Sequence, residues 1–325
     1  MSILITGGSG FIGSHLADHL LDESNDKILV LDDFSTGDAG NLDHLDTDRV
    51  EVRDGDIRDA ETVRETVGDA DAVYHLAAAV GVQNIVENPL NSLKTNLEGT
   101  ENVLEAAAED RTPVFLASSS EVYGKSEDVP FSESDDAVYG PTTTTRWGYA
   151  TAKATDEFLA LAYADERDLP VVIGRYFNIV GPRQTGQYGM VIPTFVEQAL
   201  AGEDLTVYGD GTQTRSFTHV ADAVELTHEL LENEDAHGEI FNVGAPDPTS
   251  INDLADRAIE LTDSDSEITH VPFEKVYGED FEEPDQREPD VTKLRETLGW
   301  TPEADLDRIL TDVIDERTSE EVVAE

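Results

Sequence analysis

The sequence lacks cysteine entirely, which excludes disulfide bonds, thiolate metal ligands and cysteine nucleophiles. It also lacks any apolar run near the roughly 18 residues that a membrane-spanning helix needs, and a basic secretion signal at its N-terminus. Hydrophobic residues still make up 38% of the 325 residues, enough for a substantial core. We expect a cytoplasmic protein with no membrane association and no metal site.

Basic residues are scarce. Lys and Arg number 21 against 71 Asp and Glu, which gives a formal net charge of -50 and makes nucleic acid an unsuitable partner. The acidic residues are spread along a chain in which apolar strands and amphipathic helices recur, so intrinsic disorder does not explain them. We interpret the excess as a halophilic adaptation, because in about 1 M salt the Debye length falls to about 3 Å and self-repulsion is screened.

The first 33 residues predict a strand, a helix and a second strand. Residues 3–5 form an apolar run, the apolar positions of residues 11–21 have helical spacing, and residues 28–33 form another apolar run that ends in carboxylates. A glycine-rich segment joins the first strand to the helix. This arrangement is typical of a dinucleotide-binding βαβ unit.

Three glycines and one carboxylate predict which ligand this unit binds. Gly7, Gly10 and Gly13 allow a sharp turn and a close approach to a pyrophosphate, which binds the free N–H groups at the start of a helix. Asp32 follows Gly13 by 19 residues, near the spacing at which an acid binds the adenosine ribose. Because a carboxylate repels a 2′-phosphate, the pattern predicts NAD and not NADP.

The alternation of strands and helices continues along the chain. Further strands are predicted at residues 50–58, 70–79, 112–117, 205–208 and 239–244, and helices at 60–67, 91–109, 146–165, 194–201, 220–232, 250–261 and 291–298. Such alternation predicts an α/β fold with a parallel sheet. His75 lies in a buried strand, and we interpret it as a core residue.

A serine cluster and a tyrosine-lysine pair are the candidates for catalysis. Ser118, Ser119 and Ser120 follow a predicted strand, and ligands bind at the carboxyl ends of strands in parallel sheets, although a solvated serine-rich loop is the alternative. Tyr149 and Lys153 are four residues apart and share one helix face. An ammonium near a phenol lowers the phenol pKa of about 10, which makes a base for an alcohol proton.

Together these motifs resemble the extended short-chain dehydrogenases/reductases, and among them the NAD-dependent nucleotide-sugar epimerases, dehydratases and decarboxylases. The resemblance covers nearly the whole chain and is carried by residues 6–13, 75–78, 118–124, 149–153, 175–183 and 207–217. It implies a Rossmann-type doubly wound parallel sheet in residues 1–177, with a return segment at about 213–244. Residues 178–325 are then mainly a smaller α/β domain for the nucleotide sugar. It also implies a homodimer formed through helices near 92–109 and 149–165.

The resemblance implies a role for individual residues. Ser119, Tyr149 and Lys153 match the catalytic triad, and Glu121 is a further catalytic candidate. Expected cofactor contacts are Gly7, Gly10, Phe11, Ile12, Gly13, Asp32, Asp33, Ser35, Gly37, Asp56, Ile57, Leu76, Ala77, Ala78, Asn96, Ser118, Lys153 and Tyr176. Expected contacts with a UDP-sugar are Ser120, Asn178, Val191, Tyr208, Arg215 and Arg287.

The family chemistry begins with oxidation at C4 of the sugar, and three outcomes are open. Return of the hydride to the other face makes a 4-epimerase, loss of carbon dioxide from a glucuronate makes a decarboxylase, and loss of water makes a dehydratase. Residues 120–124, 146–149 and 213–217 resemble the decarboxylase branch. The serine triad and the generic body of the sequence instead fit a UDP-hexose 4-epimerase acting on UDP-glucose, UDP-galactose or their N-acetyl forms.

We rank the 4-epimerase first, with a UDP-glucuronate decarboxylase or NDP-sugar dehydratase as alternatives. Typical dehydratases carry Asp-Glu where this chain has Ser120 and Glu121, which argues against dehydration. A non-catalytic NAD-binding regulatory protein is the alternative outside enzymes. The presence of Ser119, Tyr149 and Lys153 together argues against it.

Overall fold

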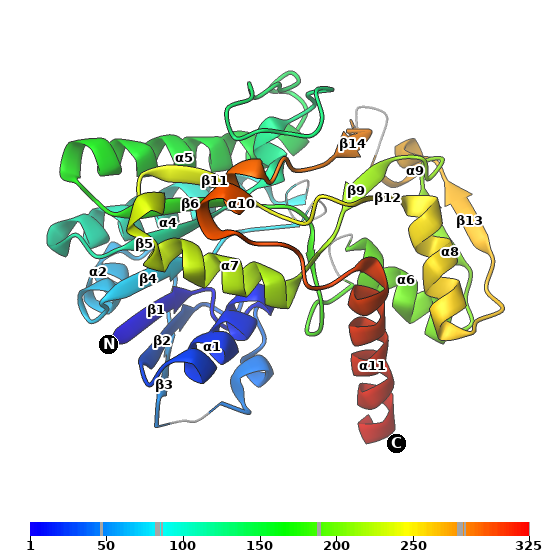
Figure 1. Cartoon of the computed structure of the whole chain (residues 1–325), viewed down its shortest axis with the longest axis horizontal. Coiled ribbons are helices and arrows are strands. Elements are labelled where there is room, and N and C mark those ends of the chain that lie inside the picture. Colours follow the sequence, from blue (N-terminus) through cyan, green and yellow to red (C-terminus); the bar gives the residue numbers. More distant parts are fainter. Residues whose placement is uncertain are drawn as a thin grey trace.

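A computed structural model describes residues 1–45, 48–81, 85, 87–186, 190–277, 282 and 284–324 (Figure 1). A seven-stranded parallel sheet forms its larger part, in the order β11-β6-β5-β4-β1-β2-β3. The strands are β1 (Ser2–Thr6), β2 (Lys27–Asp32), β3 (Val50–Asp54), β4 (Ala72–His75), β5 (Val114–Ser119), β6 (Val171–Tyr176) and β11 (Glu239–Val243). The strand order reverses between β1 and β4, where ligands bind in folds of this type.

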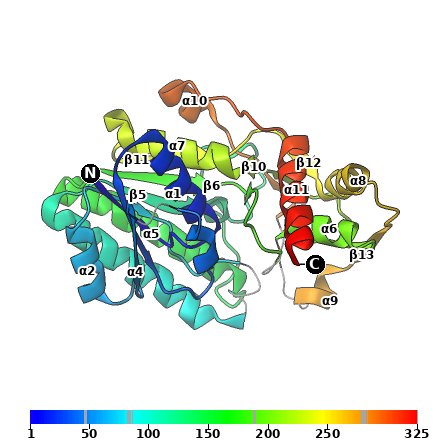
Figure 2. The ribbon, with the colours of Figure 1, turned by 90° about the horizontal axis from the view of Figure 1, so that it is seen from below.

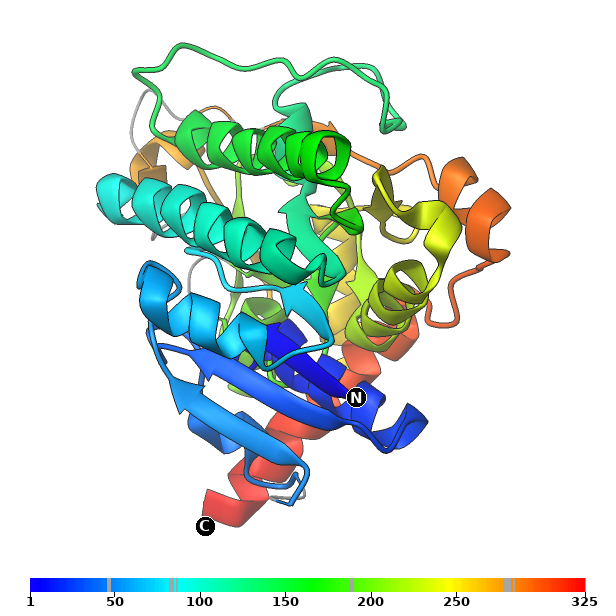
Figure 3. The same ribbon diagram turned by 90° about the vertical axis from the view of Figure 1, so that its left-hand side faces the viewer.

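Helices cover both faces of this sheet, which explains why its central strands are almost continuously apolar. Ile3 and Ile5 of β1 pack into a core that includes residues of α1 (Phe11–Glu23) and α7 (Val220–Glu232). Leu4 points to the other face, where the core includes residues of α2 (Ala60–Gly68), α4 (Pro89–Asp110) and α5 (Arg146–Arg167). Figure 3 shows the long helices α4 and α5 lying side by side over that face. Short helices η1 (Ala39–Leu42), η2 (Ser120–Tyr123), η4 (Glu234–Ala236) and α10 (Thr292–Leu298) complete this part.

The smaller part has its own core. It contains three small sheets, formed by β8 (Leu205–Tyr208) with β13 (Ile268–Val271), by β9 (Thr214–Ser216) with β12 (Pro248–Ser250) and β14 (Gln286–Arg287), and by β7 (Ile179–Val180) with β10 (Thr218–His219). Its helices are α6 (Val191–Leu200), α8 (Ile251–Thr262), α9 (Phe273–Tyr277) and α11 (Leu306–Ala324). In Figure 2 α11 lies beside α6, and its residues Ile309, Leu310 and Val313 are buried in the core of this part.

The predicted Rossmann-type α/β fold is confirmed. Of the expected return segment at 213–244, α7 and β11 join the large part, whereas β9 and β10 pair within the small sheets. The strand expected at 112–117 extends to Ser119, and α11 was not predicted. None of the described helices combines the length and the apolar character that crossing a bilayer demands.

Candidate active site

A cleft of about 1440 Å³ lies between the two parts. Its walls come from the carboxyl ends of β1, β2, β4, β5 and β6, from the start of α5, and from segments of the smaller part. Most of the residues predicted for the site line this cleft, namely Gly7, Gly10, Phe11, Ile12, Gly13, Asp32, Asp33, Ser35, Gly37, Ile57, Leu76, Ala77, Ala78, Ser118, Ser119, Ser120, Glu121, Tyr149, Lys153, Tyr176, Asn178, Val191, Tyr208, Arg215 and Arg287.

The glycine turn forms a cradle that side chains would fill. Gly7 has a φ of +72°, and a Cβ there would lie 2.8 Å from the backbone nitrogen of Ala77 on the neighbouring strand end. A Cβ on Gly13 would lie 2.3 Å from the carbonyl oxygen of Gly7. Helix α1 begins at Phe11 with no acidic residue in its first turn. The turn therefore fits the pyrophosphate of a dinucleotide, which binds free N–H groups at a helix start.

Asp32 is fixed at the end of β2 by backbone donors. Its Oδ2 accepts a hydrogen bond from Ser9 N at 2.9 Å, and its Oδ1 accepts one from Phe34 N at 2.9 Å. Burial raises the pKa of this carboxyl, and the two backbone hydrogen bonds oppose that rise. The carboxylate is thus held at the cleft wall, where a ribose would meet it.

Two predicted cofactor contacts, Asp56 and Asn96, lie outside the lining of the cleft. The Asp56 carboxylate is paired with Arg58, whose Nη2 lies 2.5 Å from Oδ2. Asn96 is buried on α4, and its Oδ1 accepts a hydrogen bond from Ala79 N at 2.8 Å. Since Ala79 itself lines the cleft, Asn96 shapes the wall and does not form it.

Several other polar groups at the cleft are occupied by the protein itself. The Ser118 hydroxyl donates to Glu157 Oε1 at 2.5 Å, and the Tyr176 hydroxyl lies 2.6 Å from Thr227 Oγ1. Asn178 Nδ2 donates to the carbonyl oxygen of Ser216 at 2.8 Å. These side chains therefore contribute shape to the cleft, and Ser119 remains the hydroxyl that the end of β5 presents next to Tyr149.

Ser119, Tyr149 and Lys153 come together where β5 meets α5. Ser119 caps η2 by accepting a hydrogen bond from Glu121 N at 3.2 Å, and its hydroxyl is also hydrogen-bonded to the Tyr149 phenol. Burial raises the pKa of Tyr149 above its ordinary value, the charge of Glu121 adds to this, and the contact with Ser119 opposes it. The sequence analysis expected Lys153 to lower this pKa. Lys153 Nζ instead donates to the carbonyl oxygen of Ala117 at 3.0 Å, and burial dominates.

Three arginines from distant segments surround Glu121. Arg287 Nη1 on β14 donates to Glu121 Oε1 at 2.8 Å, and Arg146 Nη2 at the start of α5 lies 3.2 Å from the same oxygen. Arg215 on β9 is held nearby, with its Nη2 donating to the carbonyl oxygen of Pro284 at 2.9 Å. Burial alone would raise the pKa of Glu121, but the three guanidinium charges outweigh it and lower this pKa to about 2. The cluster therefore holds an ionised carboxylate among three guanidinium groups.

Arg146 is a site residue that the predicted set omitted. Its side chain is only 4% exposed, although it lines the cleft. The signal was its position three residues before Tyr149, which places it at the start of the same helix. In a chain with 21 basic residues, a buried arginine beside a catalytic candidate marks an anion site.

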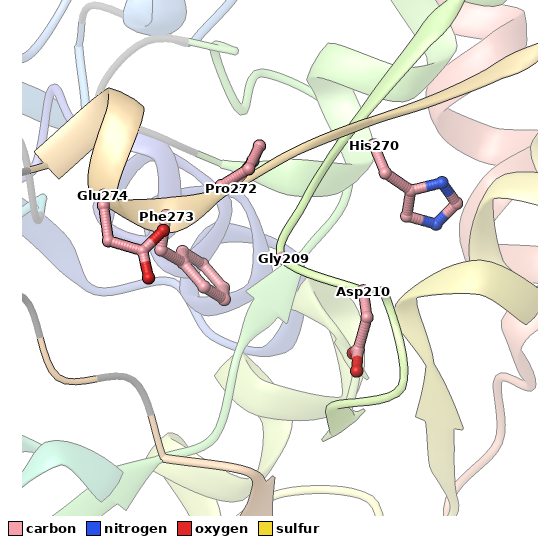
Figure 4. Close-up of a pocket in the computed structure, with 6 residues that line it drawn as sticks. All are labelled: Gly209, Asp210, His270, Pro272, Phe273 and Glu274. Atoms are coloured by element: carbon pink, nitrogen blue, oxygen red, sulfur yellow. The ribbon is translucent and has the colours of Figure 1, made fainter.

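A second, shallower hollow of about 530 Å³ lies on the smaller part. Figure 4 shows its lining residues, among which His270 lies well apart from Phe273 and Glu274. His270 Nε2 lies 2.9 Å from Asn252 Oδ1, and Asp210 Oδ1 accepts from the Thr212 hydroxyl at 2.7 Å. Because both polar side chains are hydrogen-bonded to neighbours, the described residues of this hollow do not form a candidate catalytic site.

Known proteins resemble this chain over almost its whole length. The family model described as GDP-mannose 4,6 dehydratase matches residues 4–313. A UDP-N-acetyl-alpha-D-glucosaminuronate decarboxylase of Bacillus cytotoxicus is 46% identical over 96% of this chain and 96% of its own length. A UDP-glucuronic acid decarboxylase 1 of Xenopus tropicalis is 36% identical over 96% of this chain and 71% of its own length.

A solved structure shares both the fold and the cofactor class. UDP-glucuronic acid 4-epimerase from Bacillus cereus, in complex with UDP-glucuronic acid and NAD, has a TM-score of 0.87 and 29% identity over 98% of this chain and 100% of that one. The prediction of an NAD-dependent enzyme that modifies nucleotide sugars is confirmed at the level of the family.

The first-ranked activity, a UDP-hexose 4-epimerase, is wrong. The relatives at 46% and 36% identity are named decarboxylases, whereas the 4-epimerase is a structural neighbour at 29%. The serine triad and the generic body of the sequence favoured the epimerase, but all branches share them, and residues 120–124, 146–149 and 213–217 were the better guide. With a family model spanning residues 4–313, this chain belongs to the GDP-mannose 4,6-dehydratase family of extended short-chain dehydrogenases/reductases.

Proposed function

We propose that this protein is an NAD-dependent decarboxylase of UDP-linked uronic acids, of the class that includes UDP-glucuronate and UDP-N-acetylglucosaminuronate. The arginine cluster around Glu121 carries the proposal, because a uronic acid brings a carboxylate that needs a cation beside the reacting carbons. The names of the two decarboxylase relatives support it independently. The sugar ring of a UDP-hexose carries no such carboxylate.

In this proposal the glycine turn after β1 and Asp32 would hold NAD, which would supply a reversible hydride acceptor for C4 of the sugar. Tyr149 removes the proton from the C4 hydroxyl, and Ser119 donates a hydrogen bond to the oxygen that becomes the ketone. That ketone is β to the carboxylate on C5. The bond between C5 and the carboxyl carbon then breaks, its electron pair passes into the ketone as an enolate, and a proton is finally added at C5.

The residues of the cluster have different roles in this reaction. Glu121 is ionised, so it serves to orient Arg146 and Arg287 and not to supply a proton. Arg287 is the cation that we assign to the substrate carboxylate, because it lines the cleft and its Nη1 lies 2.8 Å from Glu121 Oε1, two residues after Ser119. Arg215, held by backbone carbonyl oxygens of Thr214 and Pro284, is assigned to the pyrophosphate.

The test is to incubate the purified protein, in concentrated salt, with UDP-glucuronate, UDP-N-acetylglucosaminuronate, UDP-glucose and UDP-N-acetylglucosamine separately. Mass spectrometry should detect loss of carbon dioxide from one or both uronic acids and no change in the two hexoses. Arg287→Met should reduce kcat/KM on the uronic acid by at least roughly 100-fold. Arg295→Met on α10, an exposed position outside the cleft, is the matched control. An altered sugar of unchanged mass would contradict decarboxylation.

We also propose the assembly and the division of the chain. A homodimer through α4 and α5 is supported by two large apolar side chains exposed on these helices, Leu90 at 67% and Phe158 at 75%. Residues 1–177 with part of 213–244 then bind the cofactor, and the remainder binds the nucleotide sugar.

A further inference from the structure

A buried carboxylate lies next to the catalytic lysine. Asp156 follows Lys153 by about one turn of α5, and its side chain is fully buried, with 0% exposed. Its Oδ2 lies 3.6 Å from Lys153 Nζ, which also donates to the carbonyl oxygen of Ala117. Asp156 does not line the cleft, so any effect that it has on the reaction passes through its neighbours.

Asp156 also ends a series of buried polar side chains that leads to the nucleotide-binding turn. The Thr100 hydroxyl on α4 approaches the Asp156 carboxylate and lies 3.2 Å from His75 Nε2. His75 Nδ1 lies 2.7 Å from Thr6 Oγ1, at the end of β1. Each of these side chains is 1% exposed or less. A series of buried side chains therefore links the Lys153 ammonium to the nucleotide-binding turn at the end of β1.

Burying the Asp156 carboxylate has a free-energy cost for folding. Within the described residues neither of its carboxylate oxygens has a partner at hydrogen-bonding distance, and an incompletely satisfied buried carboxylate is destabilising. The charged groups near it are Lys153 and Glu157 on its own helix, and Glu157 is itself paired with Arg175 of β6 at 2.6 Å. His75 faces it through Thr100 and is neutral, because burial lowers its pKa to about 3.

We propose that Asp156 is a positioning residue, whose carboxylate holds the Lys153 ammonium in place and whose negative charge limits how readily Tyr149 gives up its proton. This inference rests on the proposed function, since it takes Tyr149 as the base and Lys153 as its partner. Burial is the main cause of the raised pKa of Tyr149, and the charges of Glu121 and Asp156 add to it. Burial also raises the pKa of Asp156 to about 6, against the opposing effects of Lys153 and Thr100. The negative charge is thus retained at neutral pH.

The first experiment measures turnover of the NAD-loaded protein on its uronic acid as a function of pH. In Asp156→Asn the phenolate of Tyr149 forms more readily, because a negative charge has been removed while Lys153 stays cationic. The acid limb of the kcat profile should move to lower pH by roughly one unit, with KM for the nucleotide sugar unchanged. Asp165→Asn, which removes the same charge from an exposed position of α5, should leave the profile in place.

A second variant guards against a folding defect. Asp156→Ser removes the same negative charge with a smaller side chain, so it should move the acid limb in the same direction. If Asp156→Asn does not fold, this variant carries the test alone. Unchanged profiles in both variants, or a shift equal to that of Asp165→Asn, would overturn the inference.

A third measurement needs no substrate. The absorbance of tyrosinate is titrated in the NAD-loaded protein with Tyr149 present or replaced by Phe, and the difference reports the ionisation of Tyr149 alone. The Asp156→Asn background should lower the midpoint of that difference. A lowered midpoint in a protein that turns over no nucleotide sugar would refute the proposed function while leaving the role of Asp156 intact. An unchanged midpoint would refute the role of Asp156 even in an active decarboxylase.

Discussion

At the scale of single residues, Tyr149 carries the first prediction. Tyr149→Phe keeps the ring but removes the group that accepts the C4 hydroxyl proton, so kcat should fall by at least roughly 100-fold while NAD stays bound. Tyr163→Phe, on the same helix and hydrogen-bonded to Glu105, should retain the rate of the unchanged protein. Both are measured as carbon dioxide release with the bound NAD quantified after denaturation. A normal rate in Tyr149→Phe would remove the proposed mechanism.

Glu121 carries the second prediction, which concerns stability and pH. Its pKa is lowered in the folded protein to about 2, so its ion pairs stabilise the fold above the unfolded value of about 4.3 and that contribution is lost as pH falls toward 2. Glu121→Gln removes the carboxylate that pairs with the buried Arg146 and Arg287, which should cost about 3 kcal/mol at pH 7.

Thermal unfolding at a series of pH values checks this. The difference in stability between Glu121→Gln and the unchanged protein should shrink as pH falls below about 4.3. Glu166→Gln, at an exposed position of α5, should change the unfolding temperature little at any pH. A constant difference across the pH series would mean that the carboxylate charge is not what stabilises the cluster.

The structure places a predicted residue in the lining of the cleft most consistently where a motif fixes both its type and its position. Gly7, Gly13 and Asp32 were identifiable because backbone approach and the end of β2 dictate them. For Asn96 the sequence leaves two roles open, because an amide can bind a ligand or a loop, and the fold shows that it holds Ala79. The three arginines at Glu121 come from β9, β14 and α5, and no sequence spacing reveals that such distant positions meet.

At the scale of elements, the strands of the large sheet were the most predictable, because burial on both faces demands continuous apolar runs. Helix α11 was missed, although Leu306, Ile309, Leu310 and Val313 have helical spacing. Its many acidic residues obscured that spacing. Its place in the fold depends on tertiary contacts, including the pair formed by Arg257 and Asp307 at 2.6 Å, which joins α8 to α11.

The third prediction concerns α4 and α5, which present Leu90 and Phe158 to solvent in the single chain. Phe158→Glu should convert a dimer into a monomer of 35.5 kDa, because it places a charge in the centre of an apolar contact. Light scattering coupled to size exclusion, at one salt concentration, measures the mass. Val52→Glu, which changes another exposed apolar position on β3, should leave the dimer intact. A dimer that survives Phe158→Glu would place the interface elsewhere.

At the scale of the whole molecule, the distribution of charge separates the cleft from the rest of the chain. Acidic residues outnumber basic ones by 71 to 21 overall. Among the residues that the structure describes, the cleft is lined by seven basic residues (Arg58, Arg146, Lys153, Arg183, Arg215, Arg287 and Arg317) and six acidic ones (Asp32, Asp33, Asp38, Glu87, Glu121 and Glu316). A third of the scarce cations thus face the cleft, as expected for a site that binds two anionic ligands while the outer surface is left strongly acidic.

The last prediction follows from that outer surface. A net charge of -50 on one chain destabilises the compact state by self-repulsion, and salt at about 1 M screens it over roughly 3 Å. Dialysis from concentrated KCl to low ionic strength should therefore lower the unfolding temperature by roughly 10 °C or more. Sucrose separates the causes, because it strengthens burial by exclusion from the surface without screening charge. Restoration of the unfolding temperature by KCl and not by sucrose would establish charge screening as the mechanism. An unfolding temperature that does not change with salt concentration would show that repulsion between the acidic residues does not destabilise this fold.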